Sequence, residues 1–182
     1  IQEMIIRSKG VISRKNVNQF PSRINTEIYK PIDRGEARRE LGIAVSPTVV
    51  VTSGRLAWLK GWKFMIDSFI LFEKMKPGSL FYFIGDGEDQ GKIKEYLDSN
   101  SLTEKIILVG RKEATDVALY LNAADIYIMG SYKEGWSTAL IEAIACGIPS
   151  CVTNFSSAND IIIEGKNGYV VADFNTEVFA EK

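Results

Sequence analysis

The sequence predicts an α/β fold built on a doubly wound parallel sheet, with helices on both faces. Three observations support this prediction. Short apolar runs alternate along the chain with segments of helical periodicity. The apolar runs are rich in β-branched and aromatic residues and do not alternate with polar ones, as expected of strands buried on both faces. The spacing of strands and helices is typical of βαβ units, so the strands are expected to be parallel.

The expected elements can be followed along the chain. Residues 1–33 are irregular because Pro21 and Pro31 interrupt any regular pattern, and a short helix at residues 36–41 ends at Gly42. Each strand is a run such as TVVVT, LFYFI or DIYIM, and each later helix has apolar residues three or four positions apart. The remaining elements are strands at 48–52, 80–84, 105–109, 125–129, 150–153 and 169–171, and helices or helical turns at 62–76, 89–97, 115–123, 137–146 and 159–163.

The composition excludes several classes of protein. A chain of 182 residues with 46% hydrophobic and 25% charged residues is expected to form one globular domain with a core of its own. Lys and Arg number 22 and Asp and Glu 23, so there is no basic excess for a broad nucleic-acid surface. The absence of histidine excludes imidazole chemistry within this chain. Cys146 and Cys151 lie in apolar stretches and are expected to be core residues.

Ligands of such sheets bind beyond the carboxyl ends of the strands, so the loops that follow strands are where chemistry is expected. The first such loop carries two cations, Arg55 and Lys60, and two glycines, Gly54 and Gly61, which are expected to let the turn approach a ligand closely. Each cation could form a charge-assisted hydrogen bond with an anion, at about 1.5–3 kcal/mol. The alternative is that both are solvated surface residues.

The second loop contains Gly85 in the spacing G-x-G-x-x-x-G, which differs from the dinucleotide-binding pattern G-x-G-x-x-G. Nicotinamide binding is therefore not expected. Asp86, Glu88 and Asp89 resemble a metal-binding acidic cluster, but acidic residues at a helix N-terminus, favoured by the helix dipole, are the preferred interpretation.

The third loop leads into a helix near Gly135, where Ser137 or Thr138 either caps the helix or offers its backbone N–H group to an anion. Glu142 lies inside that helix among apolar neighbours, where a carboxylate needs a polar partner. The partner is either a pair of ligand hydroxyls or a nearby Arg or Lys. Glu134 lies eight residues earlier, and it either faces a ligand or is a solvated loop acid.

In combination and order, these loops resemble the C-terminal donor-binding domain of group 1 glycosyltransferases, a large retaining family with the two-domain GT-B architecture. The resemblance runs from about residue 18 to residue 171. It rests on Gly54-Arg55-Leu56 with Lys60-Gly61, Gly85 with Gly87, Leu108-Val109-Gly110, Ala124-Asp125, the E-x7-E pair Glu134 and Glu142, and Gly165, Asn167 and Gly168.

The resemblance implies a role for each matching position. Arg55 and Lys60 would hold the donor diphosphate, and Glu142 would accept hydrogen bonds from the ribose. Glu134 would contact the donor sugar as the catalytic residue. The remaining donor-binding residues implied are the backbone amides of Gly135, Trp136, Ser137 and Thr138, the loop residues Gly54 and Gly85, and Gly110 with Arg111 beside the base.

The resemblance also implies partners and a domain organisation. The donor would be a UDP-, GDP- or ADP-sugar, with no metal and no cofactor. A saccharide or lipid-linked acceptor would bind through an N-terminal domain absent from this chain, as would any contact with a membrane. Residues 1–18 would be the remnant of the inter-domain connection, and residues 19–182 a Rossmann-like nucleotide-sugar-binding domain of a cytoplasmic protein. The alternatives are half of a GT-B nucleotide-sugar epimerase and a non-catalytic module that binds sugar nucleotides.

Overall fold

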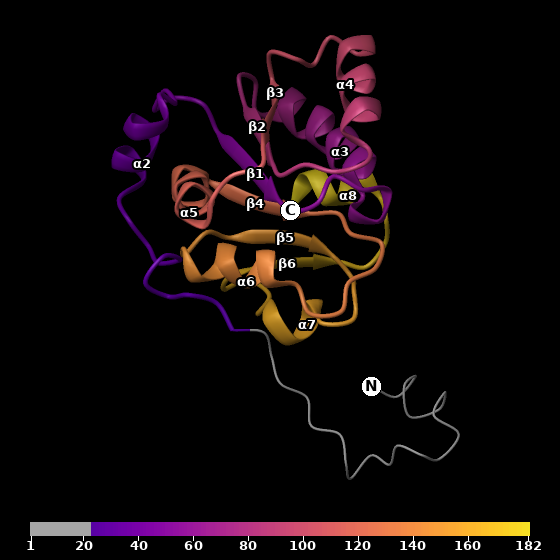
Figure 1. The fold of residues 1–182 in the computed structure, drawn as a ribbon. Coiled ribbons are helices and arrows are strands. Elements are labelled where there is room, and N and C mark those ends of the chain that lie inside the picture. The colour runs from indigo at the N-terminus through magenta and orange to yellow at the C-terminus, as the bar shows by residue number, and fades with distance from the viewer. Residues whose placement is uncertain (1–22) are drawn as a thin grey trace, which may run out of the picture.

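The computed structural model describes residues 23–182, which form one parallel sheet of six strands between two layers of helices (Figure 1). The strand order is β3-β2-β1-β4-β5-β6, so the predicted doubly wound parallel sheet is confirmed. The predicted connection at residues 1–18 lies outside the described residues. The strands are β1 (Val49–Ser53), β2 (Leu80–Ile84), β3 (Ile106–Gly110), β4 (Ile126–Met129), β5 (Ser150–Thr153) and β6 (Gly168–Val171).

The predicted helices agree with the observed ones to within about two residues at each end, which is the usual uncertainty of helix boundaries. The last helix, Thr176–Glu181, follows the predicted elements. One difference is the start of α2, which begins before the predicted residue because the Asp33 carboxylate caps it, accepting the N–H of Glu36. A 3-10 turn, η2, also lies within the first predicted loop. The helical elements are α2 (Arg34–Leu41), η2 (Trp58–Lys60), α3 (Trp62–Met75), α4 (Gln90–Ser99), α5 (Ala114–Ala123), α6 (Thr138–Ala145), α7 (Ala158–Ile161) and α8 (Thr176–Glu181).

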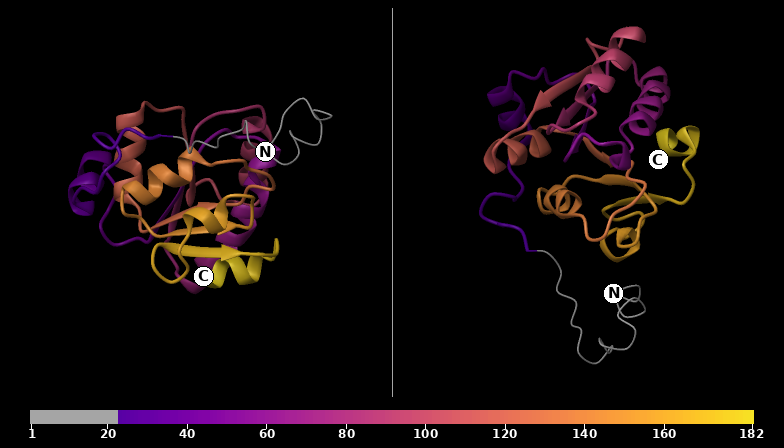
Figure 2. Two further views of the ribbon diagram at one scale, coloured as in Figure 1. Left: turned by 90° about the horizontal axis from the view of Figure 1, so that it is seen from below. Right: turned by 45° about the vertical axis from the view of Figure 1, so that its right-hand side comes forward.

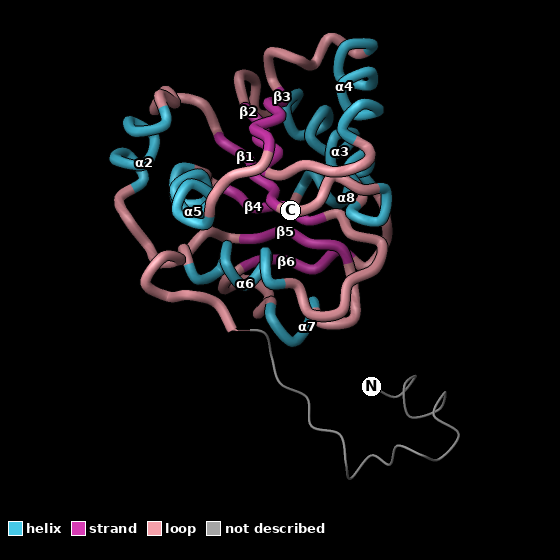
Figure 3. Tube along the Cα trace, in the orientation of Figure 1, coloured by secondary structure: helices cyan, strands magenta, loops and turns pink. Residues whose placement is uncertain are grey.

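Two apolar cores lie on opposite faces of the sheet. Figures 2 and 3 show the helices on the two sides of the sheet. Helices α2, α5, α6 and α7 cover one face, and α3, α4 and α8 cover the other. Along β1, Val49 and Val51 face the first core and Val50 faces the second. Cys146 and Cys151 are buried in these cores, as predicted. Within residues 23–182, every helix is too short or too polar to cross a lipid bilayer.

A buried ion pair ties α2 to the sheet. Arg38 is only 3% exposed, and its guanidinium donates to the Asp125 carboxylate at 2.6 Å and to the Ala123 carbonyl at 2.8 Å. The same Asp125 oxygen accepts the N–H of Val49, the first residue of β1, at 2.8 Å. The Ala124-Asp125 element of the sequence therefore has a structural role, because the Asp125 carboxylate accepts hydrogen bonds from both a buried cation and the first backbone N–H of a strand.

The loops that follow β1, β2 and β3 are joined to one another through their backbones. The Gly54 N–H donates to the Ile84 carbonyl, and the Gly85 N–H donates to the Gly110 carbonyl, each at 2.9 Å. A Cβ atom on Gly85 would lie 2.0 Å from the Gly54 oxygen, so only glycine allows this contact. Likewise, a Cβ atom on Gly61 would lie 1.9 Å from the Gly130 oxygen. Gly61 and Gly85 thus let the loops pack closely on each other.

Candidate functional site

A cleft lies at the carboxyl edge of the sheet, at the point where the chain winds outward in both directions from the neighbouring strands β1 and β4. It consists of two adjoining cavities of about 440 Å³ and 630 Å³. The first cavity lies toward Lys60 and Glu134, and the second lies toward Arg111 and Glu142. The residues common to both are Ser53, Gly54, Arg55, Ile84, Thr138 and Ala139.

Most of the site residues predicted from the sequence line this cleft. Gly110 and Gly135 do not, although the carbonyl of Gly110 anchors the N–H of the lining residue Gly85. The predicted residues that line one cavity or both are Gly54, Arg55, Lys60, Gly85, Arg111, Glu134, Trp136, Ser137, Thr138 and Glu142.

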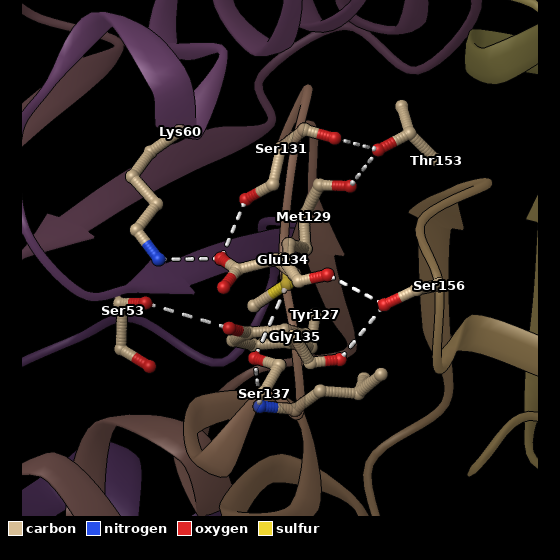
Figure 4. A network of polar contacts seen from close by, with 11 residues as sticks. Ser53, Lys60, Tyr127, Met129, Ser131, Glu134, Gly135, Ser137, Thr153 and Ser156 are labelled. Atoms are coloured by element: carbon tan, nitrogen blue, oxygen red, sulfur yellow. Dashed lines mark hydrogen bonds and ion pairs between the residues drawn. The ribbon is translucent and has the colours of Figure 1, made fainter. Parts of the chain in front are cut away.

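Lys60 and Glu134 form an ion pair in the first cavity (Figure 4). The Lys60 ammonium and the Ser131 hydroxyl, at 2.9 Å, both donate to the same carboxylate oxygen of Glu134. The Glu134 side chain is only 11% exposed. The interpretation of Glu134 as a solvated loop acid is therefore wrong. The structure instead places the Lys60 ammonium and the Glu134 carboxylate side by side at the loop before α6.

The backbone around Glu134 is held from the opposite side by the loop that follows β5 (Figure 4). The Ser156 hydroxyl lies 2.7 Å from the Glu134 carbonyl and 3.2 Å from the Gly135 carbonyl. The Thr153 hydroxyl donates to the Ser131 carbonyl at 2.8 Å. Sequence reasoning missed Ser131 and Ser156, because hydroxyls in loops carry no periodicity and each of these three contacts joins positions more than twenty residues apart.

The N-terminus of α6 opens onto both cavities. Ser137 is its N-cap, and the Ser137 hydroxyl accepts the N–H of Leu140 at 3.3 Å. Of the two candidate residues, Ser137 is therefore the one whose side chain caps the helix. An α-helix leaves its first N–H groups without intrahelical partners, so the N–H groups of Thr138 and Ala139 remain for other acceptors. Their partial positive charge favours an anion in the cleft.

Arg55 lies on the rim that the two cavities share. Its side chain is 70% exposed and forms an ion pair with Glu88 at 3.0 Å. Asp89, the N-cap of α4, accepts hydrogen bonds from Trp62 and Lys92. These two acids thus have separate partners, and residues 23–182 contain no group of three or more acidic or cysteine side chains placed to hold a metal ion.

Glu142 faces the second cavity together with Tyr29, a residue that sequence reasoning did not select. Burial raises the pKa of the Glu142 carboxyl, and the Tyr29 hydroxyl acts in the opposite direction. Burial and the Glu142 charge together raise the pKa of Tyr29 to about 12. Within the described part of the chain, no Lys or Arg forms an ion pair with Glu142. The alternative of a salt bridge to a nearby cation is therefore wrong for the described residues.

Trp136 also lines the first cavity. Its indole N–H is buried and has no hydrogen-bond partner among residues 23–182. A buried donor without a partner costs about 1–3 kcal/mol.

Comparisons with known proteins show to which family the chain is similar. The family model for glycosyl transferases group 1 matches residues 33–182. The curated relatives include alpha-monoglucosyldiacylglycerol synthase of Acholeplasma laidlawii, 29% identical over 154 residues, which are 82% of this chain and 39% of that protein. They also include an Escherichia coli UDP-Gal:alpha-D-GlcNAc-diphosphoundecaprenol alpha-1,3-galactosyltransferase, 26% identical over 85% of this chain and 41% of that protein. The chain thus spans about two fifths of the length of these relatives.

Solved structures share the fold. Anabaena Alr3699/HepE in complex with UDP and glucose superimposes with a TM-score of 0.83 at 22% identity, over 99% of this chain and 49% of that chain. The C-terminal domain of a group 1 glycosyl transferase (LpcC) from Francisella tularensis has a TM-score of 0.73 at 21% identity, over 87% of this chain and 85% of that chain. With the family model covering more than four fifths of its length, this chain belongs to the group 1 glycosyltransferases.

Proposed function

We propose that this chain is the donor-binding half of a retaining glycosyltransferase that moves a sugar from a nucleoside diphosphate to a saccharide or lipid-linked acceptor without a metal ion. The observation that carries this proposal is the placement of Lys60, Glu134 and the N-terminus of α6 in one cavity at the carboxyl edge of the sheet. The UDP and glucose bound to Anabaena Alr3699/HepE support a nucleotide-sugar donor.

In this proposal the diphosphate binds between Lys60, Arg55 and the first turn of α6. The leaving group of the reaction is a nucleoside diphosphate, on which negative charge develops as the bond to the sugar breaks. Two cations and the positive end of a helix stabilise that charge, which is the task that a divalent ion performs in other enzymes. Two charge-assisted contacts of about 1.5–3 kcal/mol each and up to about 2 kcal/mol from the helix end total at most about 8 kcal/mol, which corresponds to micromolar binding. The cost of association weakens this, so we expect an affinity between micromolar and millimolar.

The nucleoside lies in the second cavity in this proposal. Glu142 has carboxylate lone pairs available for the ribose hydroxyls, and accepting them would give this partly buried group the polar partners that it needs. Arg111 and the loop at Gly85 line the same cavity and lie on the side proposed for the base. The base itself, whether uracil, guanine or adenine, is left to experiment.

Glu134 is the proposed catalytic residue because it is the acid beside Lys60 in the first cavity. The bond between the anomeric carbon and the diphosphate oxygen breaks, and its electron pair stays on the diphosphate. The acceptor oxygen bonds to the same face of that carbon, and its proton passes to the departing phosphate oxygen. The Glu134 carboxylate contacts the sugar and stabilises positive charge on the ring during this step.

The domain organisation, the acceptor and the location of the protein are part of the same proposal. Residues 19–182 form the donor domain, and residues 1–18 form the connection to an acceptor domain outside this chain. One curated relative is named for a diacylglycerol derivative and the other for a diphosphoundecaprenol. Both names support a lipid-linked acceptor. The proposed location is the cytoplasm, with any membrane contact made through the acceptor domain.

Calorimetric titration of this chain with UDP, GDP and ADP, with magnesium and then with EDTA, tests the proposal. We expect one diphosphate to bind more tightly than the others, with the same affinity in EDTA. A requirement for magnesium would remove the metal-independent mechanism. If none of the three binds either this chain or the full-length protein, the donor site itself is disproved.

A product assay on the full-length protein with the matching nucleotide sugar separates the remaining alternatives. Sugar attached to an acceptor supports a transferase. An epimerised free sugar nucleotide would identify an epimerase, and bound donor that is never converted would identify a non-catalytic module.

A further inference from the structure

The Ser156 hydroxyl connects two loops that meet at the cleft. Ser156 follows β5, and its hydroxyl lies 2.7 Å from the Glu134 carbonyl and 3.2 Å from the Gly135 carbonyl in the loop that follows β4. In Figure 4 it approaches Glu134 from the side opposite to Lys60. Glu134 is therefore held at two ends: Ser156 holds its backbone, and Lys60 and Ser131 hold its carboxylate.

The proposed function implies that the Lys60 contact changes when a diphosphate binds. In the proposed function Lys60 donates to the diphosphate, which attracts an ammonium more strongly than one carboxylate does because it carries more negative charge. Glu134 then shares or loses its cationic partner. The contacts that remain are the Ser131 hydroxyl at 2.9 Å on the carboxylate and the Ser156 hydroxyl on the backbone.

The loop around Glu134 needs such an external contact. Its residues belong to neither β4, which ends at Met129, nor α6, which begins at Thr138, so regular backbone hydrogen bonds do not fix them. Gly135 follows Glu134 directly and has open space where a side chain would lie. A glycine at that position increases the number of backbone conformations open to the loop.

We propose that Ser156 is a positioning residue that keeps the Glu134 carboxylate directed at the donor sugar while Lys60 engages the diphosphate. This inference rests on the proposed role of Glu134. Ser156 itself is exposed, so water can replace its hydroxyl when it is removed. Its loss is therefore expected to affect the order of the loop much more than the stability of the fold.

Backbone order parameters from ¹⁵N relaxation test this directly, with and without the diphosphate that binds most tightly among UDP, GDP and ADP. In Ser156→Ala we expect the order parameters of the Glu134 and Gly135 amides to fall from about 0.85, which is typical of rigid backbone, toward about 0.6. The decrease should be clearest with the diphosphate bound. Ser156→Thr keeps the hydroxyl and should retain the wild-type values. Ser99→Ala makes the same change at an exposed serine of α4 and should have no effect.

Affinity provides the second readout. We expect Ser156→Ala to bind the free diphosphate within about twofold of wild type but to lose about three- to tenfold of the affinity for its glucose conjugate, the range expected for one hydrogen bond. Unchanged order parameters in diphosphate-bound Ser156→Ala would overturn the inference while leaving the donor site intact. If no diphosphate binds either the wild-type chain or the full-length protein, the proposed function fails, and this inference fails with it.

Discussion

The carboxylate of Asp125 lies 2.6 Å from the buried guanidinium of Arg38, and the same carboxylate oxygen receives the first N–H group of β1 from Val49. Removing one partner of a buried ion pair leaves an uncompensated charge, which costs about 3–5 kcal/mol. We therefore expect Asp125→Ala to lower the free energy of unfolding in urea by about that amount. Arg34 also pairs with Asp125 but is 60% exposed, so Arg34→Ala should cost less than about 1 kcal/mol. Equal losses in the two variants would contradict the importance of burial.

Lys60→Ala and Arg55→Ala should each weaken the binding of the preferred nucleoside diphosphate about tenfold or more, since each removes a charge-assisted hydrogen bond. Of the two side chains, Arg55 is the more exposed, so its contribution should fall more steeply as salt is added. Titration calorimetry at low and at 0.5 M salt measures both effects. Lys74→Ala, on α3 and outside the cleft, is the control. Wild-type affinity in both variants would remove the site assignment.

Glu134→Gln should separate binding from transfer. The substitution removes a negative charge that repels a diphosphate and that pairs with Lys60 in the free cleft. We therefore expect free diphosphate to bind as tightly as to wild type or up to about fivefold more tightly. Transfer by the full-length enzyme should collapse. Wild-type turnover in this variant would exclude Glu134 as the catalytic residue.

Glu142→Gln should stabilise the fold while weakening the binding of nucleotide. Burial raises the pKa of this carboxyl above its value in the unfolded chain, so the folded state binds the proton more tightly. Stability due to this group then decreases as the pH rises from the unfolded pKa through the folded pKa, and the penalty is complete above both.

Thermal melts between pH 4 and pH 8 measure this effect. We expect Glu142→Gln to melt above wild type at pH 8, with a difference that shrinks toward pH 4. Glu95→Gln, at an exposed position on α4, should show no such trend. The affinity for the diphosphate should fall by about three- to tenfold in Glu142→Gln, in line with a hydrogen bond lost to the ribose. Equal melting temperatures at pH 8 would contradict the burial of this charge.

Gly61→Ala should be strongly destabilising. The new methyl group would lie 1.9 Å from the Gly130 oxygen, at a φ of +67° that L-residues rarely adopt. We expect a loss of more than about 2 kcal/mol in urea unfolding. Gly91→Ala lies within α4 and meets nothing within 4 Å, so it should stabilise by about 0.5–1 kcal/mol. Similar effects in the two variants would show that the close approach at Gly61 is relaxed in solution.

Much of the fold could be predicted because it depends on local patterns. The run at residues 80–84 was predicted as a strand with the observed bounds, since a short run of continuous apolar residues between turn residues is typical of a buried strand. Ser137 was one of two candidate caps and is the one that caps α6. Helix starts were harder to predict, as at Arg34, because capping by Asp33 depends on where the preceding chain turns.

The partners of the charged groups could not be predicted in the same way. Tyr29 meets Glu142 and Ser156 meets Glu134 only because the sheet brings together loops that are far apart in the sequence. Local patterns contain no information on such contacts. The glycines could not be interpreted fully for the same reason. Their spacing indicates that another group approaches the backbone closely, but it does not identify that group. Gly61 meets the backbone of Gly130, whereas the sequence suggested a ligand.

The backbone contacts among Gly54, Gly85 and Gly110 have a consequence for redesign of this cleft. Gly54 and Gly85 line the cleft with backbone, and the Gly110 carbonyl holds Gly85 in place, so none of the three presents a side chain that mutation could exchange for another of a different size or charge. A library of variants meant to change which nucleotide sugar is accepted should therefore leave these positions alone. Diversity belongs in the walls of the cleft, at side chains such as Arg111 and Trp136, where a new residue can alter selectivity without separating the loops.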